Sequence, residues 1–266
     1  MTDTKMQPIA SATQALSRIT LVASDMDGTM TSHGRFSTSV FRAFDDLRNS
    51  GVRILLITGR SAGWVNGLVS LLPIDGAVAE NGGIYFPANE ESHGTELIAL
   101  RGSRKEHKEA LRNMFLILQK EFPQISEAPD NTYRLTDWTF SVEGLTDSEL
   151  TRMKTLCNSH DWDFTYSNVQ CHITPRGQDK SQGLLKLISE IPHLKADPTN
   201  VLTIGDSPND ESIFDTNKFP CSVGVANIKK YATRLAHLPA YVTTEKEGNG
   251  FCEMVAALVA SQKNRK

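Results

Sequence analysis

Two aspartates stand two residues apart at the end of an apolar segment near the start of the chain. The segment Ile19–Ala23 predicts a buried strand, and Asp25 and Asp27 follow it. Gly28 comes next and permits a tight turn. In open α/β sheets, ligands bind at the carboxyl ends of the strands. An Asp-x-Asp-Gly-Thr segment also suits a plain turn after a strand, so a chemical role needs support from other parts of the chain.

A second polar segment follows a second apolar one. Val52–Ile57 predicts another strand, and Thr58, Gly59 and Arg60 come directly after it and open a predicted helix. Free N–H groups and the helix dipole favour an anion at such a position. We therefore predict that these three residues bind a phosphate group. The same residues also suit an ordinary helix start, and Arg60 could form only a salt bridge.

A lysine and a second carboxylate cluster lie in the C-terminal third of the chain. Lys180 opens a predicted helix and offers a mobile positive charge. Asp206, Asn209 and Asp210 follow the apolar strand Val201–Ile204. Mg²⁺ prefers oxygen ligands and is usually held by one or two carboxylates with several waters. Taken singly, these residues also suit a surface lysine and a capped turn.

These residues together match the requirements of phosphoryl transfer to a carboxylate. That reaction needs an ionised nucleophile, a cation, donors for the phosphoryl oxygens and an acid/base group. Asp25 is the candidate nucleophile, and Asp27 is the candidate acid/base group. Lys180 and a Mg²⁺ ion on Asp206 would supply the positive charge. Thr58 and Gly59 would supply the donors for the phosphoryl oxygens. Since the polar residues each end a strand of one predicted parallel sheet, they can converge at one edge.

The elements that must position these residues alternate between strand and helix. Apolar strands are predicted at Ile19–Ser24, Val52–Ile57, Gly76–Ala79, Val201–Ile204 and Cys221–Val225. Helices are predicted between them, which favours an α/β fold with a Rossmann-like, doubly wound parallel sheet and right-handed crossovers.

Two helices of this core are predicted to pack by an apolar face. The first begins at Ser37 or Thr38, and its apolar face contains Val40, Phe41, Phe44 and Leu47. The second covers about residues 61–72, and its apolar face contains Trp64, Val65, Leu68 and Leu71. Residues 1–17 are predicted to form a frayed tail, although Ala12–Leu16 could form part of a short helix.

The alternation stops between residues 86 and 175. The patterns there predict a short hairpin of residues 84–86 with 96–100, two helices over about 103–122 and from 146 onward, and strands over 133–142, 163–166 and 170–174. We predict a discontinuous catalytic core, residues 1–85 and 176–266, and an inserted α+β cap, residues 86–175.

The composition is that of an ordinary globular protein. The chain has 266 residues, enough for one large domain or for one domain with an insertion, and its formal net charge is −3. Because basic residues are not in excess, we do not expect nucleic acid as a partner. The four cysteines are scattered without a C-x-x-C pair, which fits a reducing cytosol.

The sequence contains no pattern of a signal peptide or a membrane span. Residues 1–18 are polar, and no run of about 18 apolar residues occurs. We therefore expect a cytoplasmic protein with no membrane partner, which acts on a small phosphate ester as a monomer or a weak homodimer.

These residues resemble the four ordered motifs of the haloacid dehalogenase (HAD) superfamily: D-x-D-G-T, T-G-R, a lysine and G-D-x-x-N-D. They stand at residues 25–29, 58–60, 180 and 205–210, so the resemblance covers nearly the whole chain. The mixed insert is similar to that of the C2-capped (type IIB) branch, with its Cof-like and sucrose-phosphatase-like hydrolases. Glu80-Asn81-Gly82 resembles the E-N-G segment of that branch, although Asn81-Gly82-Gly83 also suits a hairpin turn.

The resemblance implies Mg²⁺, an aspartyl-phosphate intermediate and a phosphate-ester substrate, often a sugar phosphate. It implies that Asp27 contributes its backbone carbonyl to the metal. The metal ligands expected on this basis are Asp25, Asp27, Asp206 and Asp210. The residues expected to bind phosphate or substrate are Thr58, Gly59, Arg60, Lys180 and Asn209.

One position departs from the family pattern. Ser181 follows Lys180 where the family usually has glycine, and Asp179 could pair with the lysine. Substrate choice is expected to lie in the cap, which matches no subfamily cleanly. The polar candidates that could face a substrate are His33, Arg134, His172 and Arg176, and for each a structural or solvated role is the simpler interpretation.

The function favoured by these observations is that of a Mg²⁺-dependent phosphatase of a small phosphorylated metabolite, with a sugar phosphate as the expected substrate. A sugar phosphomutase of the same superfamily is an alternative, although Thr58-Gly59-Arg60 fits the hydrolases better. A non-catalytic regulatory protein of this fold is a second alternative, which the presence of Asp25, Asp27, Lys180 and Asp206 disfavours. A nucleotide-sugar transferase would leave residues 205–210 unexplained.

Overall fold

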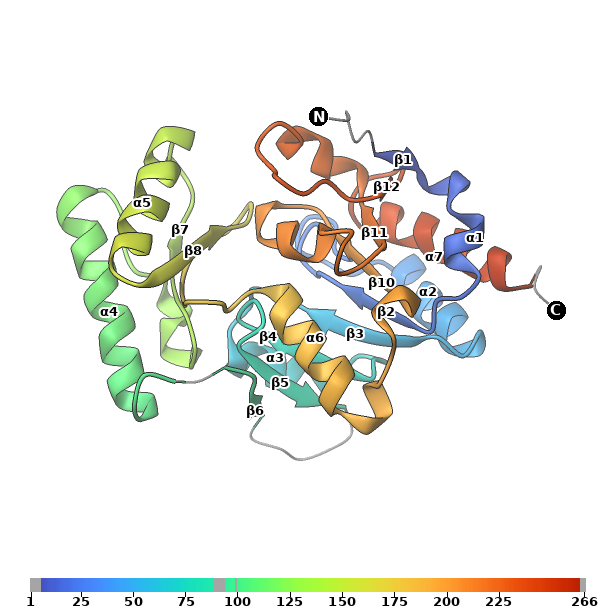
Figure 1. The fold of residues 1–266 in the computed structure, drawn as a ribbon, viewed down its shortest axis with the longest axis horizontal. Helices are drawn as coiled ribbons and strands as arrows, with labels where there is room; N and C mark the ends of the chain where they lie inside the picture. Colours follow the sequence, from blue (N-terminus) through green and yellow to red (C-terminus); the bar gives the residue numbers. More distant parts are fainter. Residues whose placement is uncertain (1–5, 89–93, 99, 264–266) are drawn as a thin grey trace.

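The computed structural model describes residues 6–88, 94–98 and 100–263, which form two sheets with helices packed against them (Figure 1). The strands are β1 Gln7–Pro8, β2 Leu21–Ser24, β3 Arg53–Ile57, β4 Gly76–Ala79, β5 Ile84–Pro87, β6 Thr95–Glu96, β7 Trp138–Ser141, β8 Trp162–Tyr166, β9 Gln170–Pro175, β10 Val201–Gly205, β11 Cys221–Gly224 and β12 Tyr241–Val242. The α-helices are α1 Thr13–Leu16, α2 Thr38–Asn49, α3 Ala62–Val69, α4 Arg104–Glu121, α5 Asp147–Ser159, α6 Lys180–Glu190 and α7 Glu247–Lys263. The 3-10 helices are η1 Ile9–Ser11, η2 Pro129–Tyr133, η3 Pro192–Leu194, η4 Pro198–Asn200, η5 Pro208–Phe214 and η6 Ala226–Tyr231.

The larger sheet has the strand order β1-β12-β11-β10-β2-β3-β4-β5-β6. The strands from β1 to β4 in this order are parallel to one another, and β5 and β6 add an antiparallel edge. The predicted α/β fold with a parallel, doubly wound sheet is therefore confirmed. The short hairpin expected after residue 84 is also present, as the pair β5 and β6.

Helices cover both faces of this sheet because the side chains of each strand alternate between two apolar cores. Val22 and Ile54 pack in the core that contains α2, α3 and α7. Leu21 and Leu55 pack in the core that contains α6 and η5. Burial on both faces explains why the central strands are almost continuously apolar.

The N-terminal segment belongs to the core, so the prediction of a frayed tail is wrong for the described residues from Met6 onward. β1 pairs in parallel with β12, and this pairing extends the sheet. Ile9, Ala12 and Leu16 are buried in the core that contains α7. Residues 1–5 of the predicted tail lie outside the described residues.

Three side chains predicted to lie on apolar helix faces are instead exposed. The exposed fraction is 42% for Phe41, 43% for Trp64 and 81% for Leu71. Leu71 lies beyond the end of α3. Trp64 turns toward the guanidinium of Arg60, whose central carbon lies 5.1 Å from the ring centroid. Helical periodicity predicts which face of a helix a residue lies on. It does not predict how much of that face the neighbouring elements cover.

The smaller sheet is antiparallel, has the order β7-β9-β8 and packs against α4 and α5 at one end of the molecule (Figure 1). The boundary predicted at residue 86 falls inside β5, which pairs in the larger sheet. The strand predicted over 133–142 is shorter, because residues 129–133 form η2 and residues 134–136 bond Gly59 and Glu80 of the core. Both ends of the described chain lie on the core, away from this sheet (Figure 1).

No helix within the described ranges combines the length and the apolar character needed to cross a bilayer.

Candidate active site

The predicted site residues meet at the carboxyl ends of three neighbouring strands. β10, β2 and β3 are adjacent in the sheet, and Asp206, Asp25 and Thr58 are the residues that follow them. The Asp25 backbone N–H donates to Ile204 O at 2.9 Å, and the Thr58 N–H donates to Val78 O at 2.9 Å. The parallel register therefore brings together side chains that are distant in sequence.

Lys180 reaches into this edge from the start of α6 and is completely buried. Its ammonium group donates to Asp25 Oδ1 at 2.6 Å and to Asp210 Oδ1 at 2.7 Å. The pairing considered between Asp179 and Lys180 does not form, because Asp179 is the N-cap of α6 and accepts from Gln182 N at 2.9 Å. Asp179 therefore does not compete for the ammonium group of Lys180, which binds Asp25 and Asp210 instead.

Asp25, Asp206 and Asp210 form a buried cluster in which one carboxylate oxygen of each lies within 4.8 Å of the others. If all three carboxylates are ionised, one ammonium leaves two negative charges uncompensated in a buried place, which is unfavourable. A divalent cation would balance them. The geometry and the hard oxygen donors both fit Mg²⁺.

The three aspartates differ in how many of their carboxylate oxygens already accept hydrogen bonds. Asp210 Oδ2 accepts the backbone N–H groups of Asp206 and Ser207, at 2.9 and 3.0 Å. Asp206 Oδ2 accepts from Asn227 Nδ2 at 2.8 Å. No hydrogen bond of the described residues uses Asp25 Oδ2, which leaves this oxygen free for chemistry.

The electrostatics of the cluster are dominated by burial. Burial, opposed by Lys180 and reinforced by Asp210, raises the pKa of Asp25 to about 7. Burial and the neighbouring Asp25 and Asp210 also raise the pKa of Asp206 well above its ordinary value. Burial lowers the pKa of Lys180, but Asp210 and Asp25 outweigh it and hold the lysine in its charged form.

Asp27 lies across the site from Lys180 and is paired with Arg60. Arg60 Nε donates to Asp27 Oδ2 and Arg60 Nη2 to Asp27 Oδ1, both at 2.8 Å. This two-bond pair raises the pKa of Arg60. Arg60 is therefore bound to the candidate acid/base residue. Of its two terminal nitrogens, only Nη1 makes no hydrogen bond to Asp27.

The loop Thr58-Gly59-Arg60 is held by its three carbonyl groups. Thr58 O accepts from Asn81 N, and Arg60 O accepts from Glu80 N, both at 3.0 Å. Gly59 O accepts from Nη1 of Arg134 at 3.0 Å. Because no hydrogen bond of the described residues uses the Gly59 N–H, this donor is available to an anion.

The cap closes over the site through the β8–β9 hairpin. A cavity of about 20 Å³ separates Asp25, Thr58 and Asn209 of the core from Ser167 and His172 of the hairpin. This volume holds one or two waters. A wider cleft of about 490 Å³ lies beside it, between Trp64 of α3 and Tyr133 of η2, and Arg60 lines both.

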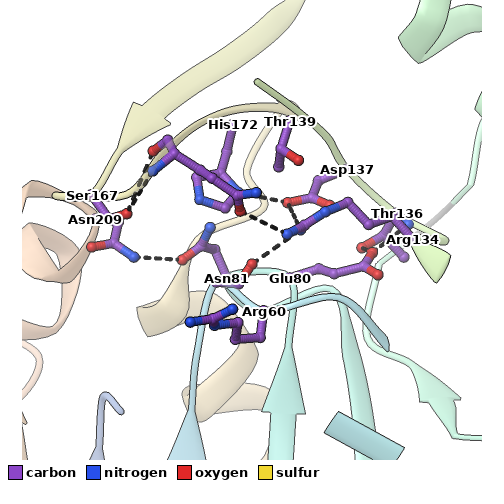
Figure 2. A network of polar contacts seen from close by, with 12 residues as sticks. Arg60, Glu80, Asn81, Arg134, Thr136, Asp137, Thr139, Ser167, His172 and Asn209 are labelled. Carbon is purple, nitrogen blue, oxygen red and sulfur yellow. Dashed lines mark hydrogen bonds and ion pairs between the residues drawn. The ribbon is translucent and has the colours of Figure 1, made fainter. Parts of the chain in front are cut away.

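A buried polar network joins the cap to the core beneath this hairpin (Figure 2). Arg134 is 1% exposed, and its Nη1 donates to both oxygens of Asp137 at 2.9 and 3.0 Å as well as to Gly59 O. Asp137 Oδ2 in turn bonds Nδ1 of His172 at 2.8 Å. The cap therefore contacts the Thr58-Gly59-Arg60 loop of the core through Arg134.

Glu80 forms the second joint of this network. Its carboxylate accepts the N–H of Ala62, which opens α3, and the N–H groups of Leu135 and Thr136 in the cap. The Thr136 hydroxyl adds a bond at 2.7 Å. Burial and the nearby Asp137 raise the pKa of Glu80 to about 7, against the effect of Arg134 and these donors.

The other polar candidates from the sequence lie apart from the site. Arg176 bonds Asp163 and Asn158 on the cap surface. His33 is an exposed loop residue with a φ of 51°. Sequence reasoning did not find Asn227 or Asp137, which belong to no motif, and it treated Asn81 as a turn residue. The Glu80-Asn81 pair directly after a strand was the available signal.

The residues 22–99 and 94–255 match the family model of haloacid dehalogenase-like hydrolases. The chain belongs to this family. It is 29% identical over 251 residues to phosphoglycolate phosphatase 1 of Saccharolobus solfataricus, which covers 92% of this chain and 97% of that protein. It is 30% identical over 238 residues to a phosphoglycolate phosphatase of Methanothrix thermoacetophila, with 89% and 96% covered. With such relatives, this HAD-like hydrolase is a phosphatase, a phosphoric monoester hydrolase.

Solved structures share its fold over nearly the whole chain. A Thermoplasma acidophilum protein has a TM-score of 0.70 at 22% identity, with 90% of this chain and 98% of that one covered. The sucrose-phosphatase of Synechocystis, solved with sucrose and phosphate, has a TM-score of 0.65 at 15% identity, with 91% and 98% covered. The shared fold is consistent with the C2-capped architecture that the mixed insert suggested.

Proposed function

We propose that this phosphatase hydrolyses a small phosphate ester with Mg²⁺ through a phosphoryl group carried by Asp25. The observation that carries the proposal is the buried cluster of Asp25, Asp206 and Asp210 beside Lys180. Its two uncompensated charges and its position next to the free Gly59 N–H provide for a divalent cation and a phosphate together.

Asp25 is proposed as the nucleophile because its Oδ2 is free while its Oδ1 is held by Lys180 at 2.6 Å. In the first step Oδ2 attacks phosphorus, the bond from phosphorus to the ester oxygen breaks, and the alcohol leaves. In the second step a water oxygen attacks the aspartyl phosphate and the bond to Asp25 breaks, which releases inorganic phosphate.

Asp27 is proposed to move the protons of both steps. It gives a proton to the leaving alcohol and takes one from the attacking water. Both roles need a carboxylate oxygen that is free to exchange a proton, whereas Arg60 donates to both oxygens of Asp27 at 2.8 Å. We infer that Arg60 withdraws from Asp27 during the cycle, toward the cleft that it also lines.

Mg²⁺ would be held by Asp25 and Asp206, with Asp210 close by and Asp27 through its backbone carbonyl, which no described residue uses as an acceptor. When bound, the ion offsets the repulsion between the phosphate and the nucleophile. Thr58, Gly59, Lys180 and Asn209 are the proposed phosphate ligands on the protein side.

The leaving group is proposed to be that of a small metabolite, with sugar phosphates as the first candidates. The names of the relatives make phosphoglycolate the other candidate. A phosphate-release assay over sugar phosphates, glycerol phosphate and phosphoglycolate, with Mg²⁺ and with chelator, tests the proposal. Release that continues undiminished in chelator would contradict the metal requirement, and conversion to an isomeric ester without phosphate release would indicate a mutase.

A further inference from the structure

Two polar atoms beside Gly59 have no hydrogen-bond partner among the described residues. Asn81 Nδ2 is a buried amide nitrogen without a hydrogen bond, although Asn81 Oδ1 accepts from Asn209 at 3.0 Å. His172 Nε2 has no partner among the described residues, although Nδ1 of the same ring bonds Asp137. A buried amide nitrogen is rarely left unpaired, so Asn81 Nδ2 indicates a missing ligand atom. His172 lines the catalytic cavity and offers Nε2 beside it.

The two atoms face the same small space. A Cβ placed on Gly59 would lie 3.1 Å from His172 Nε2 and 3.2 Å from Asn81 Nδ2. The absence of a side chain at Gly59 keeps this space open. Figure 2 shows the amide nitrogen of Asn81 directed toward the His172 ring. Gly59 and His172 both line the catalytic cavity, so the space adjoins the place of the phosphate.

The chemical character of each atom is fixed by its surroundings. Burial lowers the pKa of His172, and the ring is neutral at pH 7. Burial favours protonation of Asp137, but Arg134 and His172 outweigh it and lower its pKa. The ionised Asp137 therefore accepts the Nδ1–H, which leaves Nε2 as an acceptor. Asn81 Nδ2 can only donate.

We propose that His172 Nε2 and Asn81 Nδ2 form a subsite for a hydroxyl group of the leaving alcohol. A hydroxyl can accept from Asn81 and donate to His172 at the same time. The inference rests on the proposed phosphatase function and names its substrate class: an ester of a polyhydroxy alcohol, such as a sugar or polyol phosphate.

A carboxylate fits this place poorly. It can accept from Asn81, but its lone pairs would face the lone pair of His172. No cation on the described part of the cap faces the cavity unpaired, since Arg134 is bound to Asp130 and Asp137. Arg60 and Lys180 of the core are likewise paired with aspartates. Phosphoglycolate would therefore be a worse substrate than an ester with a hydroxyl in the same region.

The test compares three esters of similar size that differ in what they present to this space. They are glycerol 1-phosphate, n-propyl phosphate and phosphoglycolate, and p-nitrophenyl phosphate is the general phosphatase probe. We expect kcat/KM for glycerol 1-phosphate to exceed the values for the other two alkyl esters by about tenfold or more.

Two substitutions separate the hydroxyl contact from the structural bond to Asp137. His172→Asn can keep the donor to Asp137 but loses the Nε2 acceptor, whereas His172→Gln can place an amide oxygen where Nε2 lies. We expect His172→Asn to lower kcat/KM for glycerol 1-phosphate about tenfold, mainly through KM, and to reduce the value for n-propyl phosphate much less. His172→Gln should restore part of the preference. His160→Asn, on the exposed surface of the cap, is the matched control.

Equal use of glycerol and propyl esters by the wild type, or a preference for phosphoglycolate, would overturn the subsite. An equal loss for every ester in His172→Asn would show a structural role only and would also overturn it. A wild-type protein that releases no phosphate from any ester, p-nitrophenyl phosphate included, would overturn the proposed function itself, and the subsite with it.

Discussion

Asp25, the nucleophile of the proposed reaction, is a single buried side chain with two unlike oxygens. Its two oxygens have different surroundings, because Lys180 holds Oδ1 and Oδ2 has no partner among the described residues. Burial raises its pKa to about 7, so the ionised form needs the lysine and a metal beside it. The same carboxylate is thus costly to the fold and, in the proposed function, has one oxygen available for attack.

Asp25→Asn should abolish phosphate release, with a loss of at least about 10³ in kcat, because an amide cannot carry the phosphoryl group. The thermal midpoint should not fall, since the substitution removes a buried charge while retaining the shape. Single-turnover phosphate release and thermal unfolding would be measured together. Asp45→Asn, an exposed aspartate of α2, is the control. Substantial turnover by Asp25→Asn would move the nucleophile elsewhere.

Asp27→Asn should lower kcat about 10²–10⁴-fold, as is usual for an acid/base group. Arg60→Gln should cost less, because Arg60 acts on the reaction through Asp27. The double variant should then be no worse than Asp27→Asn alone, since the two residues act as one unit. Additive losses in steady-state kinetics of the double variant would show that Arg60 binds the substrate independently of Asp27.

At the scale of elements, the end of β4 joins the two halves of the protein. Glu80 and Asn81 both have positive φ angles, 54° and 52°, which turn the chain sharply after the strand. Their backbone N–H groups hold the Thr58–Arg60 loop, and the Glu80 carboxylate holds the start of α3 and residues 135–136 of the cap. One turn therefore holds both the Thr58–Arg60 loop and residues 135–136 of the cap.

Glu80→Gln should lower the free energy of unfolding by about 1–3 kcal/mol. The new NH₂ group is a donor, and it would lie against N–H groups that donate to the carboxylate of Glu80. The difference from wild type should depend on pH. Glu80 has a folded pKa of about 7 against 4.5 when unfolded, so folding favours its protonated form. The advantage, at most about 3 kcal/mol, is present below pH 4.5 and is lost as the pH rises through 7.

Chemical unfolding of both proteins between pH 5 and pH 8 would measure this effect. We expect the gap between wild type and Glu80→Gln to be widest near pH 5 and to narrow toward pH 8. Glu143→Gln, at an exposed position of the cap, provides the matched control. A gap that widens with pH would mean that the donors around Glu80, and not its burial, decide its charge.

At the scale of the whole molecule, the core sheet and the cap enclose a region of excess negative charge. The three aspartates converge from β2 and from the end of β10, and the cap hairpin shields them from solvent. A cavity of about 20 Å³ is too small for a sugar phosphate. The wider cleft of about 490 Å³, which shares Arg60 and Gln170 with this cavity, offers more room beside it.

Mg²⁺ should raise the thermal midpoint, and the rise should be larger at pH 8 than at pH 5.5. The metal binds ionised carboxylates, and the raised pKa values of Asp25 and Asp206 let protons compete with it at lower pH. Thermal unfolding with Mg²⁺ or chelator at both pH values would measure this. Asp206→Asn should remove most of the shift and Asp45→Asn none. A shift that is equal at both pH values would place the metal outside the cluster.

The sequence by itself determined the sheet core and the identity of the residues that follow its strands. Apolar runs that end in Asp25, Thr58 and Asp206 contain this information locally, because a buried parallel strand must be apolar and its carboxyl end must be polar. Lys180 could be assigned to the same site because it opens a predicted helix that packs on this sheet.

Only the tertiary structure decided which groups pair and which remain free. Arg60 could have met the phosphate or an aspartate, and its partner Asp27 is 33 residues away in sequence. Asp137, His172 and Arg134 come from a loop, a strand and a turn of the cap, and no local pattern brings them against Gly59. Such contacts depend on how the cap packs on the core, which is set by long-range packing and not by the periodicity of any one segment.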